Sequence, residues 1–260
     1  MATANYQQRR EQIEDYFDRT AADVWARLTS DEPVSGVRET VRAGRESMRN
    51  LLLSWLPQDL TGKQVLDAGC GTGVISIELA KRGAEVIAVD LSQSLIDLAN
   101  ERYSGVDEYH RIQFIVGDMR QVQGERFDHV IAMDSIIHYA ARDGVKTLET
   151  LAQSVEDSMV FTFAPKTLPL AAMHAVGKLF PRADRAPAIE PISPHSLTQA
   201  LSNSSALQDW KIGKGHRVST GFTPRKPWRS REYADFSRAI HGTERAHQCA
   251  LSAVAKCCRG

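Results

Sequence analysis

Two patterns of hydrophobic and polar residues divide the chain near residue 60. Before this point apolar residues recur every three or four positions, which predicts amphipathic helices that end at Pro57. After it, short apolar runs alternate with segments of helical periodicity. The apolar positions of the first part are Ile13, Phe17, Val24, Leu28, Val37, Val41, Met48, Leu52 and Trp55.

The alternation after residue 60 predicts an α/β fold. The runs QVLDAG, EVIAVD, RIQFIVGD, FDHVIAMD and SMVFTFAP are typical of strands, and GVISIELAKRG, SQSLIDLANERY and DGVKTLETLAQS of helices. Ser92 is expected to cap the second of these helices. Strands joined by helices form a mostly parallel, doubly wound, Rossmann-like sheet, and nearly continuous apolar strands fit a sheet covered on both faces.

Composition narrows the classes of partner. Lys plus Arg and Asp plus Glu both number 32, so no net field favours nucleic acid. No apolar run reaches membrane-spanning length, and the N-terminus lacks a signal-type apolar core. The four cysteines include no CxxC pair, so no bound metal is expected and a cytoplasmic location is the default. The apolar segment 168–180 is the exception: it fits a membrane-surface contact, a ligand wall or ordinary core packing.

A glycine-rich loop follows the first predicted strand. It reads Asp67-Ala68-Gly69-Cys70-Gly71-Thr72-Gly73, that is, D-x-G-x-G-x-G. A dinucleotide fingerprint would need its third glycine at position 74, which is Val74. The loop resembles motif I of the class I S-adenosylmethionine-dependent methyltransferases, which implies that Asp67 meets the cationic methionine end of that cofactor. A tight turn without a ligand is the alternative.

The next three strand ends carry suitable residues in order. An acidic residue about 20 positions after the loop suits the ribose hydroxyls, and Asp90 stands there. The resemblance implies that Asp118 meets the adenine amino group, and that the end of the fourth strand, Ala132-Met133-Asp134, lies beside the methionine moiety and the sulfonium. The predicted cofactor residues are Asp67, Ala68, Gly69, Cys70, Gly71, Gly73, Asp90, Leu91, Asp118, Met119, Met133 and Asp134.

The segments DYFDRTAADVWARLTS, VRETVRAGRESMRN and FTFAPKT closely resemble the magnesium protoporphyrin IX methyltransferase family of bacteriochlorophyll synthesis. The resemblance implies an N-terminal lid (1–60), a core (61–222) and a seven-stranded sheet. It also implies methyl transfer from S-adenosylmethionine to one propionate of magnesium protoporphyrin IX, giving the 13-monomethyl ester. Magnesium would enter only within the substrate, and handover from magnesium chelatase is an implied partnership.

Candidate catalytic residues follow from this chemistry. A propionate is an anion at neutral pH, so no strong base is needed. We expect His138 to hydrogen-bond the reacting carboxylate, with Tyr16 of the lid as a second donor. The alternatives for His138 are a role in core packing and axial ligation of the porphyrin magnesium. The alternative for Tyr16 is that it only anchors the lid helix. Arg38, Arg42 and, more weakly, His174 are candidate substrate contacts.

Two other functions stay open at this stage. One is O-methylation of another small molecule such as a quinone precursor, and the other is a porphyrin carrier without catalysis. The tail (223–260) has a composition unlike the rest, and TPRKPWRSREYADF predicts a poor central strand. If the seventh strand, begun within 210–222, is lost, the fifth strand keeps an open edge and the sixth is detached. A frame change near Phe222 is our hypothesis and a divergent tail the alternative, which gene sequencing distinguishes.

Overall fold

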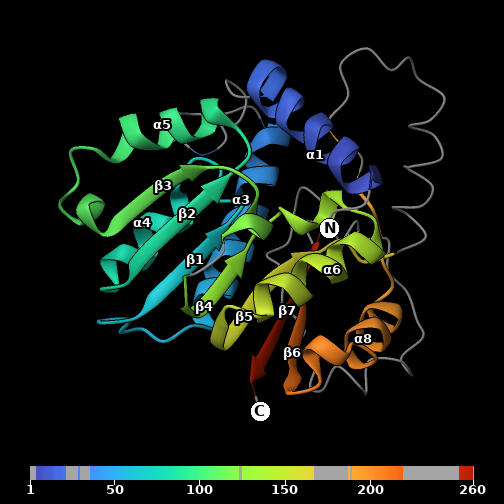
Figure 1. Ribbon diagram of the computed structural model, residues 1–260. Coiled ribbons are helices and arrows are strands. Elements are labelled where there is room, and N and C mark those ends of the chain that lie inside the picture. Colours follow the sequence, from blue (N-terminus) through green and yellow to red (C-terminus); the bar gives the residue numbers. More distant parts are fainter. Residues whose placement is uncertain are drawn as a thin grey trace.

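The computed structural model describes residues 4–21, 29, 36–122, 125–166, 187, 189–218 and 252–259. A seven-stranded, mostly parallel sheet runs through them in the order β3-β2-β1-β4-β5-β7-β6 (Figure 1). The predicted Rossmann-like fold is therefore confirmed. The strands are β1 (Gln64–Ala68), β2 (Glu85–Asp90), β3 (Ile112–Val116), β4 (Phe127–Ala132), β5 (Val155–Phe163), β6 (Trp210–Val218) and β7 (Ser252–Arg259).

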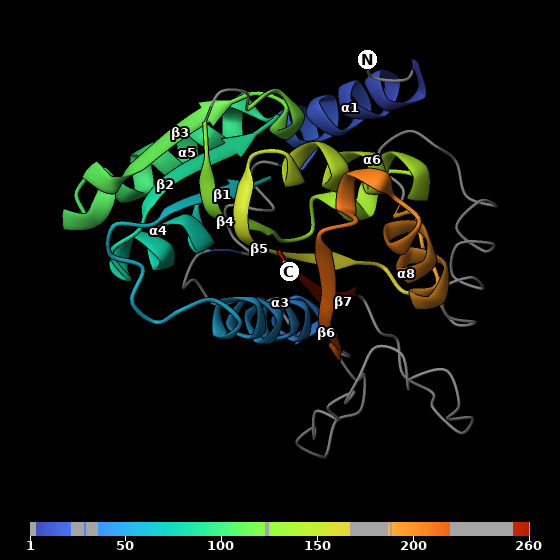
Figure 2. The same cartoon turned by 60° about the horizontal axis from the view of Figure 1, so that its bottom comes forward.

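Helices cover both faces of the sheet, as its apolar strands require. Figure 2 shows α3 (Gly36–Ser54) on the side of the sheet opposite α6 (Ala141–Ala152) and α8 (Pro194–Ser202). One core cluster joins Leu52 of α3 and residues of α4 (Val74–Lys81) to β1 and β2. The other joins Leu148 and Leu197 to β4 and β5. Each face buries its own apolar layer, so the sheet is a rigid base for loops at its edges.

Local chemistry explains where the helices begin. The Ser92 hydroxyl accepts the N–H of Leu95 at the start of α5 (Gln93–Tyr103), which confirms the predicted cap. The α8 helix begins in the same way, since Ser193 accepts the N–H of Ser196 and Pro194 occupies the first turn. Both caps supply an acceptor to a backbone donor that has no partner within the helix.

The N-terminal helix α1 (Ala4–Tyr16) and the short π-helical turn η1 (Phe17–Ala21) lie across the carboxyl edge of the sheet (Figure 1). An apolar cluster anchors them to the segment that follows β4. Tyr6 and Ile13 are buried against Tyr139, and Phe17 packs beside them. Two predicted stripe positions, Val24 and Leu28, lie outside the described residues, as does the apolar segment 168–180.

The seventh strand, whose loss the composition of the tail had left open, is present. β7 lies between β5 and β6 and is antiparallel to both, with Met159 opposite Cys257 on one side and Ile212 opposite Cys257 on the other. The whole of 210–218 belongs to β6, so β7 does not begin within it. Ala255 and Cys257 are buried on the α6 face, and Lys256 donates to the carbonyl of Trp55 on the other. The tail thus completes the sheet.

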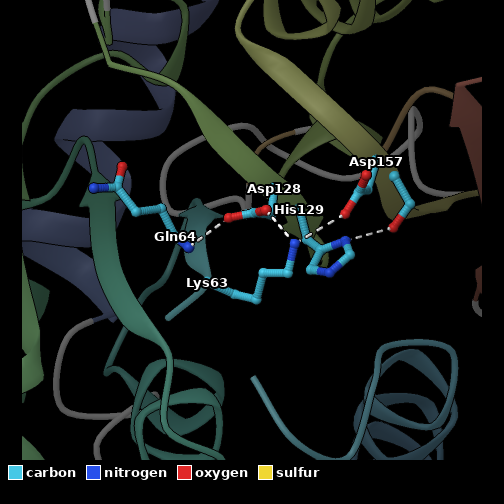
Figure 3. Close-up of polar contacts among 6 residues, drawn as sticks. Lys63, Gln64, Asp128, His129 and Asp157 are labelled. Atoms are coloured by element: carbon cyan, nitrogen blue, oxygen red, sulfur yellow. Dashed lines mark hydrogen bonds and ion pairs between the residues drawn. The ribbon is translucent and has the colours of Figure 1, made fainter. Parts of the chain in front are cut away.

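A polar cluster of Lys63, Gln64, Asp128, His129 and Asp157 closes the amino edge of the sheet (Figure 3). Lys63 lies 2.6 Å from Asp128 and 3.5 Å from Asp157. Asp128 also accepts the backbone N–H of Gln64, at 2.8 Å. His129 is buried, and its Nδ1 lies 3.0 Å from the Ser158 hydroxyl across β4 and β5. These contacts join β1, β4 and β5, so we assign the cluster a structural role.

Nowhere in the described part of the chain does a helix have the length and apolarity to cross a membrane.

Candidate active site

A cavity of about 490 Å³ opens at the carboxyl ends of β1, β2 and β4, beneath α1 and beside α3. Ligand sites in doubly wound sheets form at this edge. Its wall includes most of the residues predicted from sequence, drawn from six separate segments. They are Tyr16, Arg42, Asp67, Gly69, Cys70, Gly71, Asp90, Leu91, Met119, Met133, Asp134 and His138.

The glycine loop needs its glycines for geometric reasons. Gly69 has φ of 85° and its N–H donates to the carbonyl of Val89 at 2.7 Å. A Cβ placed on Gly69 would lie 2.3 Å from the Cβ of Ser135, which no real contact allows. Gly71 has φ of 54° and nothing within 4 Å of such a Cβ, so its backbone faces open space on the cavity side. The loop is therefore shaped for a ligand to approach the main chain.

Two buried carboxyls flank this loop. Asp67 is 1% exposed and accepts the Ser76 hydroxyl at 2.7 Å. Burial raises the pKa of Asp67 to about 7, with Asp90 adding to the rise and the Ser76 bond opposing it. Burial also raises the pKa of Asp90, which accepts the N–H groups of Gly71 at 2.8 Å and Ser92 at 3.0 Å. A cationic ligand would favour the ionised form of both carboxyls.

The lid helix reaches the third strand end. The Tyr6 hydroxyl donates to Oδ1 of Asp118 at 2.8 Å, and this carboxylate oxygen also accepts the backbone N–H of Arg120 at 2.9 Å. The Tyr6 ring stacks on Tyr139 with centroids 4.9 Å apart, and the Arg120 guanidinium lies over the Tyr6 ring, 4.2 Å from its centroid. Asp118 is outside the cavity wall, whereas Met119 lines it. The predicted contact of Asp118 with adenine stays a prediction, as do those of Ala68 and Gly73, which are also outside the wall.

The fourth strand end holds a strained residue. Asp134 has φ of 56°, in the left-handed region that a non-glycine residue rarely adopts. Its N–H donates to the Thr162 hydroxyl of β5 at 2.7 Å. Its carboxylate forms an ion pair with Arg45, which α3 brings to the cavity. The strain is therefore held in place by contacts from two other elements.

The two candidate catalytic residues share one wall of the cavity. His138 ends a short 3₁₀ turn (Ile136–His138) after β4, and Tyr16 is the last residue of α1. Phe17 contacts both, with ring centroids 6.2 Å from His138 and 5.2 Å from Tyr16. Burial raises the pKa of Tyr16, so its phenol remains a neutral donor. The end of α1 and the segment after β4 thus meet at the cavity wall.

The arginines of α3 divide in two. Arg42, Arg45 and Arg49 line the cavity, whereas the side chain of Arg38 lies outside the described residues. His174 lies outside them as well. Within the described part of the chain, His, Cys, Asp and Glu form no cluster suited to a metal ion.

Sequence reasoning missed two residues that dock the lid. Asp18 accepts the Ser92 hydroxyl at 2.6 Å and the N–H of Ser94 at 3.1 Å, which fixes η1 to the start of α5. Tyr6 is the other. Asp18 lies within the family-like YFDRTA segment. The sequence signal for its contact was the pair of hydroxyl residues, Ser92 and Ser94, at the predicted start of a helix. Tyr6 precedes every segment that carried the resemblance, so no pattern marked it.

The strand order, the antiparallel seventh strand and the carboxyls at successive strand ends define a class I S-adenosylmethionine-dependent methyltransferase. Two family models agree: "Methyltransferase domain" matches residues 65–158, and "Magnesium-protoporphyrin IX methyltransferase C-terminus" matches residues 132–225. The chain belongs to the magnesium-protoporphyrin O-methyltransferase family, because it is 46% identical to the Rhodobacter capsulatus member. That match covers 83% of this chain and 96% of the relative.

Two further comparisons support this membership. The Synechocystis magnesium-protoporphyrin O-methyltransferase is 35% identical over 172 residues, which are 65% of this chain and 74% of the relative. The crystal structure of magnesium protoporphyrin IX methyltransferase from Synechocystis with bound S-adenosylhomocysteine superposes with a TM-score of 0.74. It is 26% identical in sequence, and the match covers 96% of this chain and 99% of that one.

Proposed function

We propose that this protein transfers a methyl group from S-adenosylmethionine to the 13-propionate carboxylate of magnesium protoporphyrin IX. The observation that carries the proposal is one cavity that joins the motif I loop to Tyr16 and His138. The products are the monomethyl ester and S-adenosylhomocysteine. The cofactor lies along the glycine loop, with Asp67 at its ammonium and Asp90 at its ribose.

The reaction needs positioning more than base catalysis. A propionate carries its negative charge at neutral pH, and its attack on the sulfonium methyl cancels two charges. Such a step is accelerated by in-line alignment and by exclusion of water. The lid residues Ile13, Tyr16 and Phe17 supply an apolar cover over the cavity. They reduce the water near the reacting atoms.

His138 and Tyr16 have separate roles in this proposal. Each donates a hydrogen bond to the propionate, so that one carboxylate oxygen points at the methyl group. His138 also takes up any proton that the acid form of the substrate brings. Arg42 approaches the second propionate from α3 through a forked contact. Magnesium enters only as part of the porphyrin.

The test is direct assay by mass spectrometry. Purified protein with S-adenosylmethionine and magnesium protoporphyrin IX should add one methyl group to the porphyrin. Tyr16→Phe and His138→Asn should each lower kcat about ten- to hundredfold, the range expected for a lost hydrogen bond to a charged group. Tyr109→Phe is the matched control, because it removes a hydroxyl that contacts Asn100 outside the cavity.

Other outcomes would redirect the assignment. Binding of the porphyrin without ester formation would favour the carrier alternative. Methylation of a quinone precursor in preference to the porphyrin would favour the other O-methyltransferase alternative. Equal activity of the two site variants and the control would reject the roles given to Tyr16 and His138.

Location and handover are part of the same proposal. We expect the protein in the cytoplasm, with peripheral contact to the photosynthetic membrane, and substrate delivered by magnesium chelatase. The apolar segment 168–180 and the poor solubility of a porphyrin support a surface contact. Co-sedimentation with phosphatidylglycerol vesicles and pull-down with the chelatase subunits test these two points separately.

A further inference from the structure

The Arg45–Asp134 ion pair at the cavity wall has no role in the proposed chemistry so far. The side chains are 26% and 14% exposed respectively, and both line the cavity. Arg45 lies in the middle of α3, and Asp134 follows β4, so two elements bring opposite charges together. Burying a charge is unfavourable unless a partner compensates it, and this pair supplies that compensation.

Asp134 is held unusually firmly for a residue after a strand. Its left-handed backbone is unfavourable for a side chain with a Cβ. Thr162, fully buried on β5, accepts its N–H at 2.7 Å and lies 3.5 Å from its Oδ1. The other carboxylate oxygen, Oδ2, meets Nη1 of Arg45. The backbone strain and both contacts together fix where the guanidinium sits.

The neighbourhood of this pair suits a carboxylate ligand. A planar guanidinium with several N–H groups matches the geometry of a carboxylate better than an ammonium does. Ser135 lies beside it, facing Gly69, and its buried hydroxyl has no hydrogen-bond partner among the described residues. An unsatisfied buried hydroxyl at a cavity wall is suited to bond a ligand.

Both ligands of the proposed reaction bring carboxylates to this cavity. S-adenosylmethionine has one on its methionine end, and the porphyrin has its propionates. An unpaired arginine near the sulfonium would repel it, whereas Asp134 neutralises Arg45 at this point. The pair thus offers a cation to a carboxylate without adding net charge beside the sulfonium.

Building on the proposed function, we infer that Arg45 binds a ligand carboxylate in this site, and that Asp134, held by Thr162, is its positioning residue. The role differs from the one proposed for Tyr16 and His138, which donate hydrogen bonds to the reacting carboxylate. Ser135 adds a hydroxyl to the same carboxylate.

The test compares each ligand with a form that lacks the carboxylate. Dissociation constants are measured for S-adenosylmethionine against decarboxylated S-adenosylmethionine, and for magnesium protoporphyrin IX against its dimethyl ester. Arg45→Gln should weaken one carboxylate-bearing ligand about ten- to hundredfold and its carboxylate-free form less than about twofold. Loss confined to the cofactor pair assigns the methionine carboxylate, and loss confined to the porphyrin pair assigns a propionate.

Matched variants keep the test decisive. Arg126→Gln removes an exposed arginine paired with Glu156 at the amino edge, and should change none of the four constants. Arg45→Lys keeps the charge but not the planar fork, so it should show an intermediate loss and serves if Arg45→Gln does not fold. Asp134→Asn should weaken S-adenosylmethionine more than uncharged-sulfur S-adenosylhomocysteine, because Arg45 loses its neutralising partner.

Two results would overturn the inference. One is equal weakening of the carboxylate-bearing and carboxylate-free forms in both pairs, which would mean a structural role for Arg45. The other is unchanged binding of all four ligands. The proposed function is tested separately, because wild-type ester formation does not depend on these ratios. Absence of ester from the wild type, with the ratios as expected for the cofactor, would reject the substrate and keep Arg45 as a carboxylate site.

Discussion

The buried carboxyl of Asp67 leads to a quantitative prediction about pH. Burial raises its pKa to about 7, above the ordinary value for an aspartate. The folded, ligand-free protein therefore holds a proton that the unfolded chain releases. Its free energy of unfolding should fall as the pH rises from the ordinary pKa of an aspartate towards 7. Cofactor binding has the opposite dependence, because the ligand ammonium pairs with the ionised carboxylate.

The size of the effect follows from the fraction ionised. With a pKa of about 7 the carboxyl of Asp67 is about 3% ionised at pH 5.5 and about half ionised at pH 7.0. The ligand ammonium remains protonated across this interval. If binding requires the ionised form, the dissociation constant of S-adenosylhomocysteine should fall about 16-fold between these two pH values.

Isothermal titration calorimetry measures this directly. Titrations in two buffers with different ionisation enthalpies should also show proton release below pH 7. Asp67→Asn should bind more weakly and lose the pH dependence, whereas Asp128→Asn, at the far edge of β4, should keep it. A wild-type constant that changes less than twofold would refute the reasoning. A dependence that survives in Asp67→Asn would transfer it to Asp90, whose pKa is also raised.

Three further predictions concern the loop, the lid and the amino edge. Gly69→Ala should abolish cofactor binding and lower the melting temperature, because its Cβ would overlap Ser135; calorimetry and thermal melts measure this. Tyr6→Phe leaves Asp118 without one donor and should cost about 1–3 kcal/mol of lid docking, seen as faster proteolysis within α1, with unchanged cleavage refuting it. Burial lowers the pKa of His129, so the free energy of unfolding should decrease as the pH is lowered below about 6.5, by up to about 1.4 kcal/mol per pH unit. Urea unfolding at several pH values should show this slope in the wild type and not in His129→Gln.

The central strands and the loop could be read from sequence because each follows from local chemistry. β1, β2 and β4 are covered on both faces, so their apolar runs are nearly continuous. The glycines at 69 and 71 mark left-handed backbone that other residues disfavour. Ser92 was identifiable as a cap because its hydroxyl precedes a helical pattern.

β7 escaped prediction because its signal is weak. Its buried positions include Ala255 and Cys257, small residues that resemble the surrounding polar tail more than a central strand. What marks it as a strand is alternation, since Lys256 and Cys258 point to the other face. That alternation becomes clear only when β5 and β6 lie on either side.

The site divides in the same way. Residues at strand ends could be predicted because parallel strands bring their carboxyl ends to one edge. Pairings between distant side chains could not, since spacing carries no information about them. Tyr6 meets Asp118 across 112 residues, and Arg45 meets Asp134 across 89.

The position of β7 near the end of the given sequence also determines when the sheet can be completed during translation. β5 ends at Phe163 and its partner begins at Ser252, 89 residues later. At roughly 5–20 residues per second, a ribosome needs on the order of 4–18 s to make that interval. Throughout it, one side of β5 has unpaired backbone groups that can recruit another nascent chain. Yield in a cell should therefore depend on chaperones that bind during translation, even though the finished sheet has that edge filled.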